Sequence, residues 1–89
     1  MKDVVTVLGK DKKGIIAEVS TALYKMEINI EDISQTIMQD YFTMIMLVDT
    51  SDSKLSFKEI FDSLKKLGEN LGLTIRIQQE DIFSAMHSV

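Results

Sequence analysis

The sequence predicts an α+β fold of the ferredoxin-like type, in which a four-stranded antiparallel sheet carries two helices on one face. Apolar runs mark four strands, and two segments carry apolar residues at helical spacing, in the order βαββαβ. The halves of the chain also align with a constant offset, which places Ile15 on Ile60 and Ile30 on Ile75. Two adjacent βαβ units with right-handed crossovers put both helices on the same face.

The first half of the chain predicts a strand, a helix and a second strand. Residues 4–8 are apolar on both faces and end at Gly9, which is typical of a central strand. Residues 14–26 form the first helix, because apolar side chains recur along one of its faces. These are Ile15, Ile16, Val19, Ala22, Leu23 and Met26. Residues 30–38 alternate polar and apolar side chains, which favours a strand at the sheet edge.

The second half repeats this order. Residues 41–48 are the most apolar segment and predict a central strand beside the first. Ser56 and Glu59 have the spacing of a capping box that opens the second helix, and Gly72 ends it. The predicted buried stripe of this helix contains Phe57, Ile60, Phe61, Leu64, Leu67 and Leu71. Residues 73–77 alternate again and predict the other edge strand.

The composition describes one domain over residues 1–89 and excludes several classes of protein. Hydrophobic residues make up 45% of the chain, so a folded core is expected. The net charge of −4 argues against binding to nucleic acid or to an anionic membrane. The longest apolar run, residues 41–48, is far shorter than a membrane span, and the N-terminus does not resemble a signal peptide. We therefore expect a cytoplasmic protein.

The pattern also predicts a homodimer. Two helices cover one sheet face only, whereas the central strands are apolar on both faces, so a single copy exposes a hydrophobic surface. The tail, residues 81–89, places Ile82, Phe83 and Met86 at helical spacing. We expect this tail to be helical or extended and to form a cover or part of the dimer contact.

No arrangement of residues predicts catalysis, a metal site or a cofactor. The chain has no Cys, and its one His, His87, stands near the end with no sequence-evident partner for acid–base chemistry. Glu31 and Asp32 are neighbours on a strand, so they point to opposite faces and do not share an ion easily. The protein is therefore not expected to be an enzyme.

The loop before the first helix is the candidate binding element. Gly14 permits a ligand to approach the main chain closely, and the amides that begin the helix could hold a carboxylate. The alternative is an ordinary turn in which Asp11 caps the helix. The residues alone leave both interpretations open.

Two segments resemble an ACT domain: Asp11-x-x-Gly14-Ile15-Ile16-Ala17 and Ile28-Asn29-Ile30-Glu31-Asp32-Ile33. Over its full length the chain is similar to stand-alone bacterial ACT-domain proteins of the UPF0237 type. The resemblance implies a regulatory module that binds an amino acid or similar small metabolite at a dimer interface. It assigns the ligand to Asp11, Gly14 and Asn29, together with the backbone around Ile15 and at Ile28 and Ile30.

Two functions compete on this basis. The first is a non-enzymatic sensor that binds an amino acid or a similar small metabolite and signals to a separate protein. The second is a module for protein–protein interaction or dimerisation that has no ligand and uses its edge strands. Asp11 is acidic near the expected carboxylate, and Lys12 or Lys13 could offset that repulsion.

Overall fold

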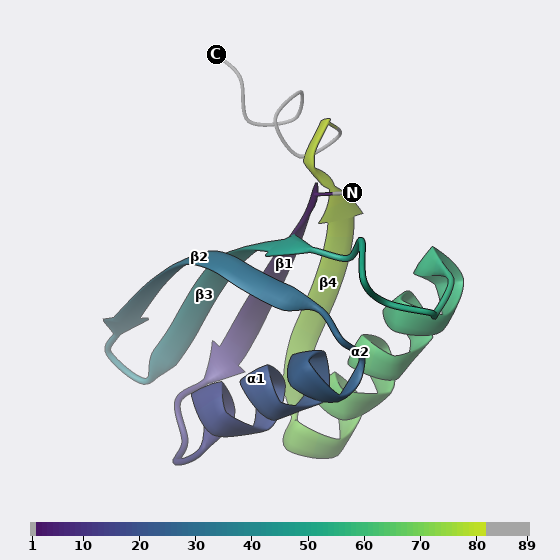
Figure 1. Ribbon diagram of the computed structural model, residues 1–89. Helices are drawn as coiled ribbons and strands as arrows, with labels where there is room; N and C mark the ends of the chain where they lie inside the picture. Colours follow the sequence, from purple (N-terminus) through teal and green to yellow (C-terminus); the bar gives the residue numbers. More distant parts are fainter. Residues whose placement is uncertain (1, 82–89) are drawn as a thin grey trace.

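The structure, a computed structural model, describes residues 2–81 of the 89-residue chain. Six elements follow in the predicted βαββαβ order (Figure 1). They are β1 (Lys2–Lys10), α1 (Ile15–Lys25), β2 (Asn29–Met38), β3 (Tyr41–Asp49), α2 (Phe57–Leu71) and β4 (Leu73–Gln79). Most of the tail, with Ile82, Phe83, Met86 and His87, lies outside the described residues, so its expected role stays a prediction.

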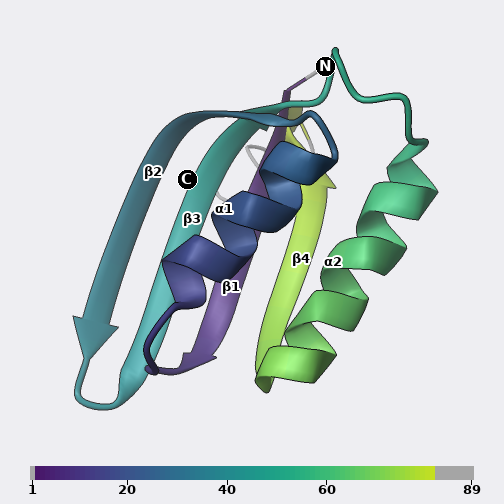
Figure 2. The ribbon, with the colours of Figure 1, turned by 60° about the horizontal axis from the view of Figure 1, so that its bottom comes forward.

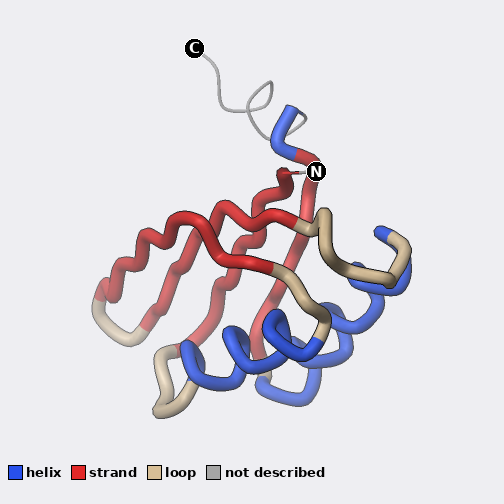
Figure 3. The backbone as a smooth tube through the Cα atoms, in the orientation of Figure 1, coloured by secondary structure: helices blue, strands red, loops and turns tan. Residues whose placement is uncertain are grey.

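The four strands form one antiparallel sheet in the order β2-β3-β1-β4. The predicted central strands, β1 and β3, are therefore central, and β2 and β4 are the edges. Figure 3 shows both helices on the same side of this sheet, which confirms the predicted ferredoxin-like architecture. A β-bulge interrupts the pairing of β2 with β3 between Ile30 and Asp32.

The core lies between the sheet and the helices. β1, β3 and β4 contribute alternate residues, β2 contributes only the half-buried Ile30, and each helix contributes a stripe at three- and four-residue spacing. The most buried of these side chains are Val5, Val7, Val19, Leu23, Met44, Met46, Val48, Ile60 and Leu64. The two buried methionines fill the middle of β3, so the apolar character of that segment is explained by packing.

Three members of the predicted helical stripes are exposed. Ile16 of α1 and Phe57 and Phe61 of α2 each keep about 40% of their surface exposed. Helical periodicity identifies which face is apolar, but it does not say how far the sheet extends beneath that face. Figure 2 shows that α2 runs alongside β4 at the edge of the sheet, so part of its stripe projects beyond the last strand.

The sheet face turned away from the helices carries apolar side chains without cover from the described elements. Leu8 of β1 and Ile45 of β3 are 47% and 39% exposed. Thr6, two residues before Leu8 in β1, is the residue that pairs with Ile45. The expectation that one copy leaves a hydrophobic surface open is therefore met.

The second helix begins and ends as its sequence predicts. The Ser56 hydroxyl accepts a hydrogen bond from the Glu59 amide (3.1 Å), and the Glu59 carboxylate accepts one from the Ser56 amide (2.9 Å). The hydrogen bond from the Ser56 amide is the main cause that lowers the pKa of the Glu59 carboxyl, and the Ser56 side chain adds to it. Gly72 follows the helix with a φ of 71°, a conformation that glycine adopts without steric cost.

One acidic side chain, Asp3, is buried on the helix-facing side of β1. One of its carboxylate oxygens accepts a hydrogen bond from the Thr50 hydroxyl (3.2 Å), and the other has no partner in the part of the chain that the structure describes. Burial raises the pKa of Asp3, because the charged form loses hydration. This carboxylate therefore weakens the fold at neutral pH.

Candidate functional site

A shallow hollow of about 180 Å³ lies where β1 passes into α1. Its wall is formed by the first loop, the first turn of α1 and the neighbouring strands. The lining residues are Asp11, Lys12, Gly14, Ile15, Ile16, Ala17, Gln35, Ile37 and Phe42. The first loop predicted from sequence therefore borders a recess, and three of the predicted ligand residues, Asp11, Gly14 and Ile15, share it.

The start of α1 is free of side-chain capping. The N-cap residue is Gly14, in the left-handed region at a φ of 85°, and no side chain of residues 2–81 caps the first turn. The alternative in which Asp11 caps this helix is therefore wrong. A helix start without a cap presents unsatisfied amides and a partial positive charge. A Cβ atom at Gly14 would have no atom within 4 Å, so the space beside it is open.

Backbone and lysine contacts hold the first loop in place. The Asp11 amide donates a hydrogen bond to the Asp40 carbonyl (2.7 Å), which ties the loop to the β2–β3 turn. The Lys12 ammonium donates to the Leu71 carbonyl at the end of α2. Lys12 and Lys13 were the two lysines expected to offset the negative charge of Asp11. Lys12 is bound to α2 instead, and no hydrogen bond of Lys13 occurs among the described residues.

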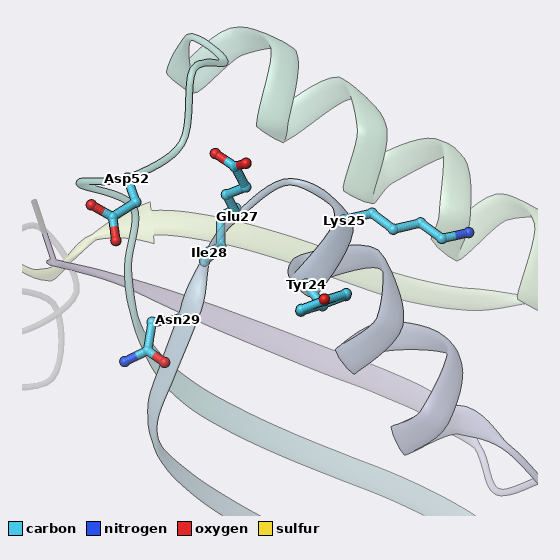
Figure 4. Close-up of a pocket in the computed structure, with 6 residues that line it drawn as sticks. All are labelled: Tyr24, Lys25, Glu27, Ile28, Asn29 and Asp52. Atoms are coloured by element: carbon cyan, nitrogen blue, oxygen red, sulfur yellow. The ribbon is translucent and has the colours of Figure 1, made fainter.

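A second, larger hollow of about 600 Å³ lies at the other end of α1 (Figure 4). It is lined by Tyr24, Lys25, Glu27, Ile28, Asn29 and Asp52. Figure 4 shows Tyr24 and Lys25 on the last turn of α1, Asn29 on β2 and Asp52 on the loop after β3. Ile28 and Asn29, two further predicted ligand residues, therefore lie here rather than beside Gly14.

The end of α1 has the hydrogen bonds of a Schellman motif. The Glu27 amide donates to the Tyr24 carbonyl, and the Ile28 amide donates to the Leu23 carbonyl, both at 2.9 Å. Glu27 occupies the left-handed position, with a φ of 60°, where glycine is the usual residue. Ile28 and Leu23 are both in the core, so this motif fixes the direction in which β2 leaves the helix.

The loop that carries Asp52 is ordered by its own polar groups. The Asp49 carboxylate accepts hydrogen bonds from the Ser51 hydroxyl (2.6 Å) and amide (2.9 Å). These bonds lower the pKa of Asp49 to about 2, so it is ionised at neutral pH. In the register of the sheet Asp49 stands opposite Asn29, the first residue of β2.

The predicted ligand residues thus divide between two places at opposite ends of α1. Asp11, Gly14 and Ile15 precede or begin this helix, whereas Ile28 and Asn29 follow it. Ile30 is half-buried against the core and lines neither hollow. An 11-residue helix is about 16 Å long, so one small molecule does not reach both ends within a single copy.

Sequence reasoning did not identify Tyr24, Glu27 and Asp52, which line the second hollow. Tyr24 is 80% exposed and falls outside the apolar stripe of α1, which is the one signal that could have marked it. Glu27 and Asp52 stand in segments that the sequence indicated only as connections. No group of three or more potential metal ligands occurs within residues 2–81.

The fold and the sequence that form these two hollows match known proteins. The ACT domain family matches residues 4–78 of the chain. The chain belongs to the ACT domain family. It is 57% identical to a UPF0237 protein of Clostridium acetobutylicum over the full length of both.

Solved structures have the same fold. An ACT domain protein from Streptococcus pneumoniae has a TM-score of 0.83 and 44% identity, over 98% of both chains. A formyltetrahydrofolate deformylase from Pseudomonas putida KT2440 has a TM-score of 0.81 at 11% identity, over 91% of this chain and 30% of that one. The second likeness concerns the fold alone.

An ACT domain is a regulatory module that binds small ligands, and this is the general role that membership assigns to the chain. Within the described residues, neither helix has the length and apolar character needed to cross a lipid bilayer.

Proposed function

We propose that two copies of this chain bind an amino acid or a similar small metabolite between them, and that the bound state is read by a separate protein. The observation that carries the proposal is the division of the predicted ligand residues between the two ends of α1. A site that is incomplete in one copy becomes complete if a second copy supplies the missing half.

The exposed edge of β2 offers a way to join the halves. Gln35 and Ile37, near the end of β2, line the first hollow, whereas Asn29 begins the strand. Antiparallel pairing of two β2 strands sets the end of one beside the start of the other. The hollow beside Gly14 then faces Ile28 to Ile30 of the partner subunit.

Exposed apolar side chains support this pairing. Ile33 and Ile37 lie on the helix-facing side of β2 and are 45% and 56% exposed, because no helix extends over this edge. Ile16 of α1 is exposed beside the same hollow. A second copy along β2 would remove these side chains from water, which favours association by about 25 cal/mol for each Å² of apolar surface buried.

The charges at the joined site suit a zwitterion. The amides that begin α1 favour a carboxylate, and Lys13 of the same loop adds a positive charge. Asp11 lines the hollow and attracts an ammonium group, and the side-chain carbonyl oxygen of the partner subunit's Asn29 can accept a hydrogen bond from that group. An α-amino acid carries these two groups on one carbon, so Asp11 and the helix start bind different ends of it.

Melting temperatures in the presence of each common amino acid and related metabolites test the proposal. A ligand at 100 times its dissociation constant adds about 2.7 kcal/mol to the free energy of unfolding, which raises the midpoint by several degrees. Gly14→Val should abolish that rise. Ser63→Val is the control, because it adds a valine at an exposed position of α2 that lies outside both hollows.

The second candidate is the module without a ligand, in which the edge strands and exposed apolar residues serve protein contacts alone. The exposed Ile33 and Ile37 favour it as much as they favour a sensor, since a partner of any kind would cover them. A panel without any rise in melting temperature would contradict the sensor and leave this function. A rise that survives Gly14→Val would contradict the assigned site.

A further inference from the structure

The second helix extends beyond the sheet that it covers. Ile60 and Leu64 of α2 are buried, whereas Phe57 and Phe61 are 41% and 40% exposed. Phe57 and Phe61 are one helical turn apart, so they stand on the same side of α2. Figure 2 shows this helix along the outer side of β4, where the sheet has no further strand. The apolar stripe is therefore wide enough for one more strand than residues 2–81 supply.

A groove of about 370 Å³ occupies the place of that strand. Residues 74–78 of β4 form one wall, and Phe61 and Lys65 of α2 form the other. Among the described strands, β4 pairs with β1 alone, so the outer backbone edge of residues 74–77 faces the groove and can pair with an added strand. Phe61 would then cover the side chains that the added strand turns toward the helices.

The charge of the groove selects among possible occupants. Its lining contains two cations, Lys65 and Arg76, and no carboxylate, although the whole chain has a net charge of −4. A second copy of β4 would bring a second Lys65 and a second Arg76 to the same place, and like charges in one groove repel. An acidic strand is complementary to it.

We propose that the groove between α2 and β4 binds an extended, acidic segment of another protein as a fifth strand of the sheet. Main-chain hydrogen bonds to β4 give the binding energy that is independent of sequence. An apolar side chain under Phe61 and carboxylates near Lys65 and Arg76 give the selectivity.

This groove is independent of the proposed metabolite site. It lies at the edge opposite to β2, with β3 and β1 between the two edges. The pairing of two copies along β2 would leave β4 accessible. Failure of one proposal therefore does not imply failure of the other.

Two labelled peptides of about eight residues test the proposal, one alternating Val with Glu and the other Val with Lys. Fluorescence anisotropy should show that the acidic peptide binds saturably and the basic peptide does not. In Lys65→Glu/Arg76→Glu the acidic peptide should bind at least roughly tenfold more weakly, and the basic peptide should now bind. Lys10→Glu/Lys66→Glu is the matched control, since it changes the net charge equally at positions outside the groove.

Backbone amide chemical shifts locate the bound peptide. Changes in chemical shift at residues 74–78 and along α2 are expected. Phe61→Ala should weaken the binding of the acidic peptide to the wild-type protein and of the basic peptide to Lys65→Glu/Arg76→Glu. The proposal is overturned if the acidic peptide does not bind at about 1 mM, a generous limit for added strands, or if it shifts β2 instead. A change of sedimentation mass in Lys65→Glu/Arg76→Glu without peptide would also overturn it, because a second copy would then be the occupant.

Discussion

A Cβ atom on Gly68 would lie 2.6 Å from the carbonyl oxygen of Leu73, so α2 and the start of β4 meet through their backbones. Gly68 is buried although it stands in the last turns of a helix. Glycine is a poor helix former, and alanine at an exposed helical position is better by about 1 kcal/mol. Its presence here is explained by the close approach to β4 rather than by the helix.

We expect Gly68→Ala to destabilise the protein in spite of the gain in helix propensity. The backbone oxygen of Leu73 does not move as a flexible side chain would, and an overpacked core typically loses about 1–3 kcal/mol. Urea unfolding followed by circular dichroism measures the change. Ser63→Ala, on the exposed side of α2, is the control and should be neutral or slightly stabilising. Equal stability of Gly68→Ala and the wild type would show that the two elements separate easily.

Glu27→Gly should raise the free energy of unfolding by roughly 0.5–1 kcal/mol, because Glu27 adopts a φ of 60° that costs an L-residue energy and glycine little. The gain is partly offset by the greater freedom of glycine in the unfolded chain. Thermal and urea unfolding both measure it. Glu27→Ala removes the same carboxylate but keeps the strained backbone, so it should give no gain. Equal gains from both variants would assign the effect to charge.

Local patterns in the sequence predicted the strands, the capping box and the stop at Gly72, because each depends on neighbouring residues. The division of the predicted ligand residues follows from a longer element. The helix predicted over residues 14–26 separates Gly14 from Asn29, and α1 confirms that separation. Glu27 gave no signal of a left-handed turn, since glycine is the residue expected there.

Tertiary geometry explains the remaining differences. Phe57 and Phe61 follow the helical period of a buried stripe, and their exposure depends on where β4 ends the sheet. The burial of Asp3 follows the alternation of β1, since it shares a face with Val5. Because aspartate is usually exposed, the sequence pattern did not mark Asp3 as a buried residue of this strand.

The buried carboxyl of Asp3 predicts a dependence of stability on pH. Its pKa is raised in the folded protein above the ordinary value of 3.8. The folded state therefore holds more protons than the unfolded state as pH rises through this range, so stability falls with rising pH. We expect the stability of Asp3→Asn relative to the wild type to increase from about pH 4 upward. Melting temperatures of both proteins across this range measure it.

Thr50→Val provides the converse test of the same carboxyl. The Thr50 hydroxyl donates to Asp3 and favours its charged form, so its loss should raise the pKa further. Thr50→Val should then destabilise the protein more at pH 7 than at pH 4. A difference between Asp3→Asn and the wild type that does not vary with pH would mean that Asp3 is hydrated in solution.

The proposed shared site predicts that two inactive variants restore binding when mixed. Gly14→Val damages the first-loop half and Asn29→Ala the β2 half, so neither homodimer should respond to the amino acid found in the melting panel. In a mixed dimer, the loop of the Asn29→Ala copy meets the intact β2 start of the Gly14→Val copy, which restores one of two sites. Random exchange should therefore recover about a quarter of the wild-type binding capacity.

Calorimetric titration of the mixed sample after refolding together measures this capacity, and the separately refolded variants are the controls. A site built within one copy would give no recovery, because every chain would carry one damaged half. Recovery well above a quarter would mean that Asn29→Ala alone retains binding, which would remove Asn29 from the site. Recovery near a quarter with an unchanged affinity requires residues of both copies at each ligand, because only the mixed dimer contains an undamaged pair of halves.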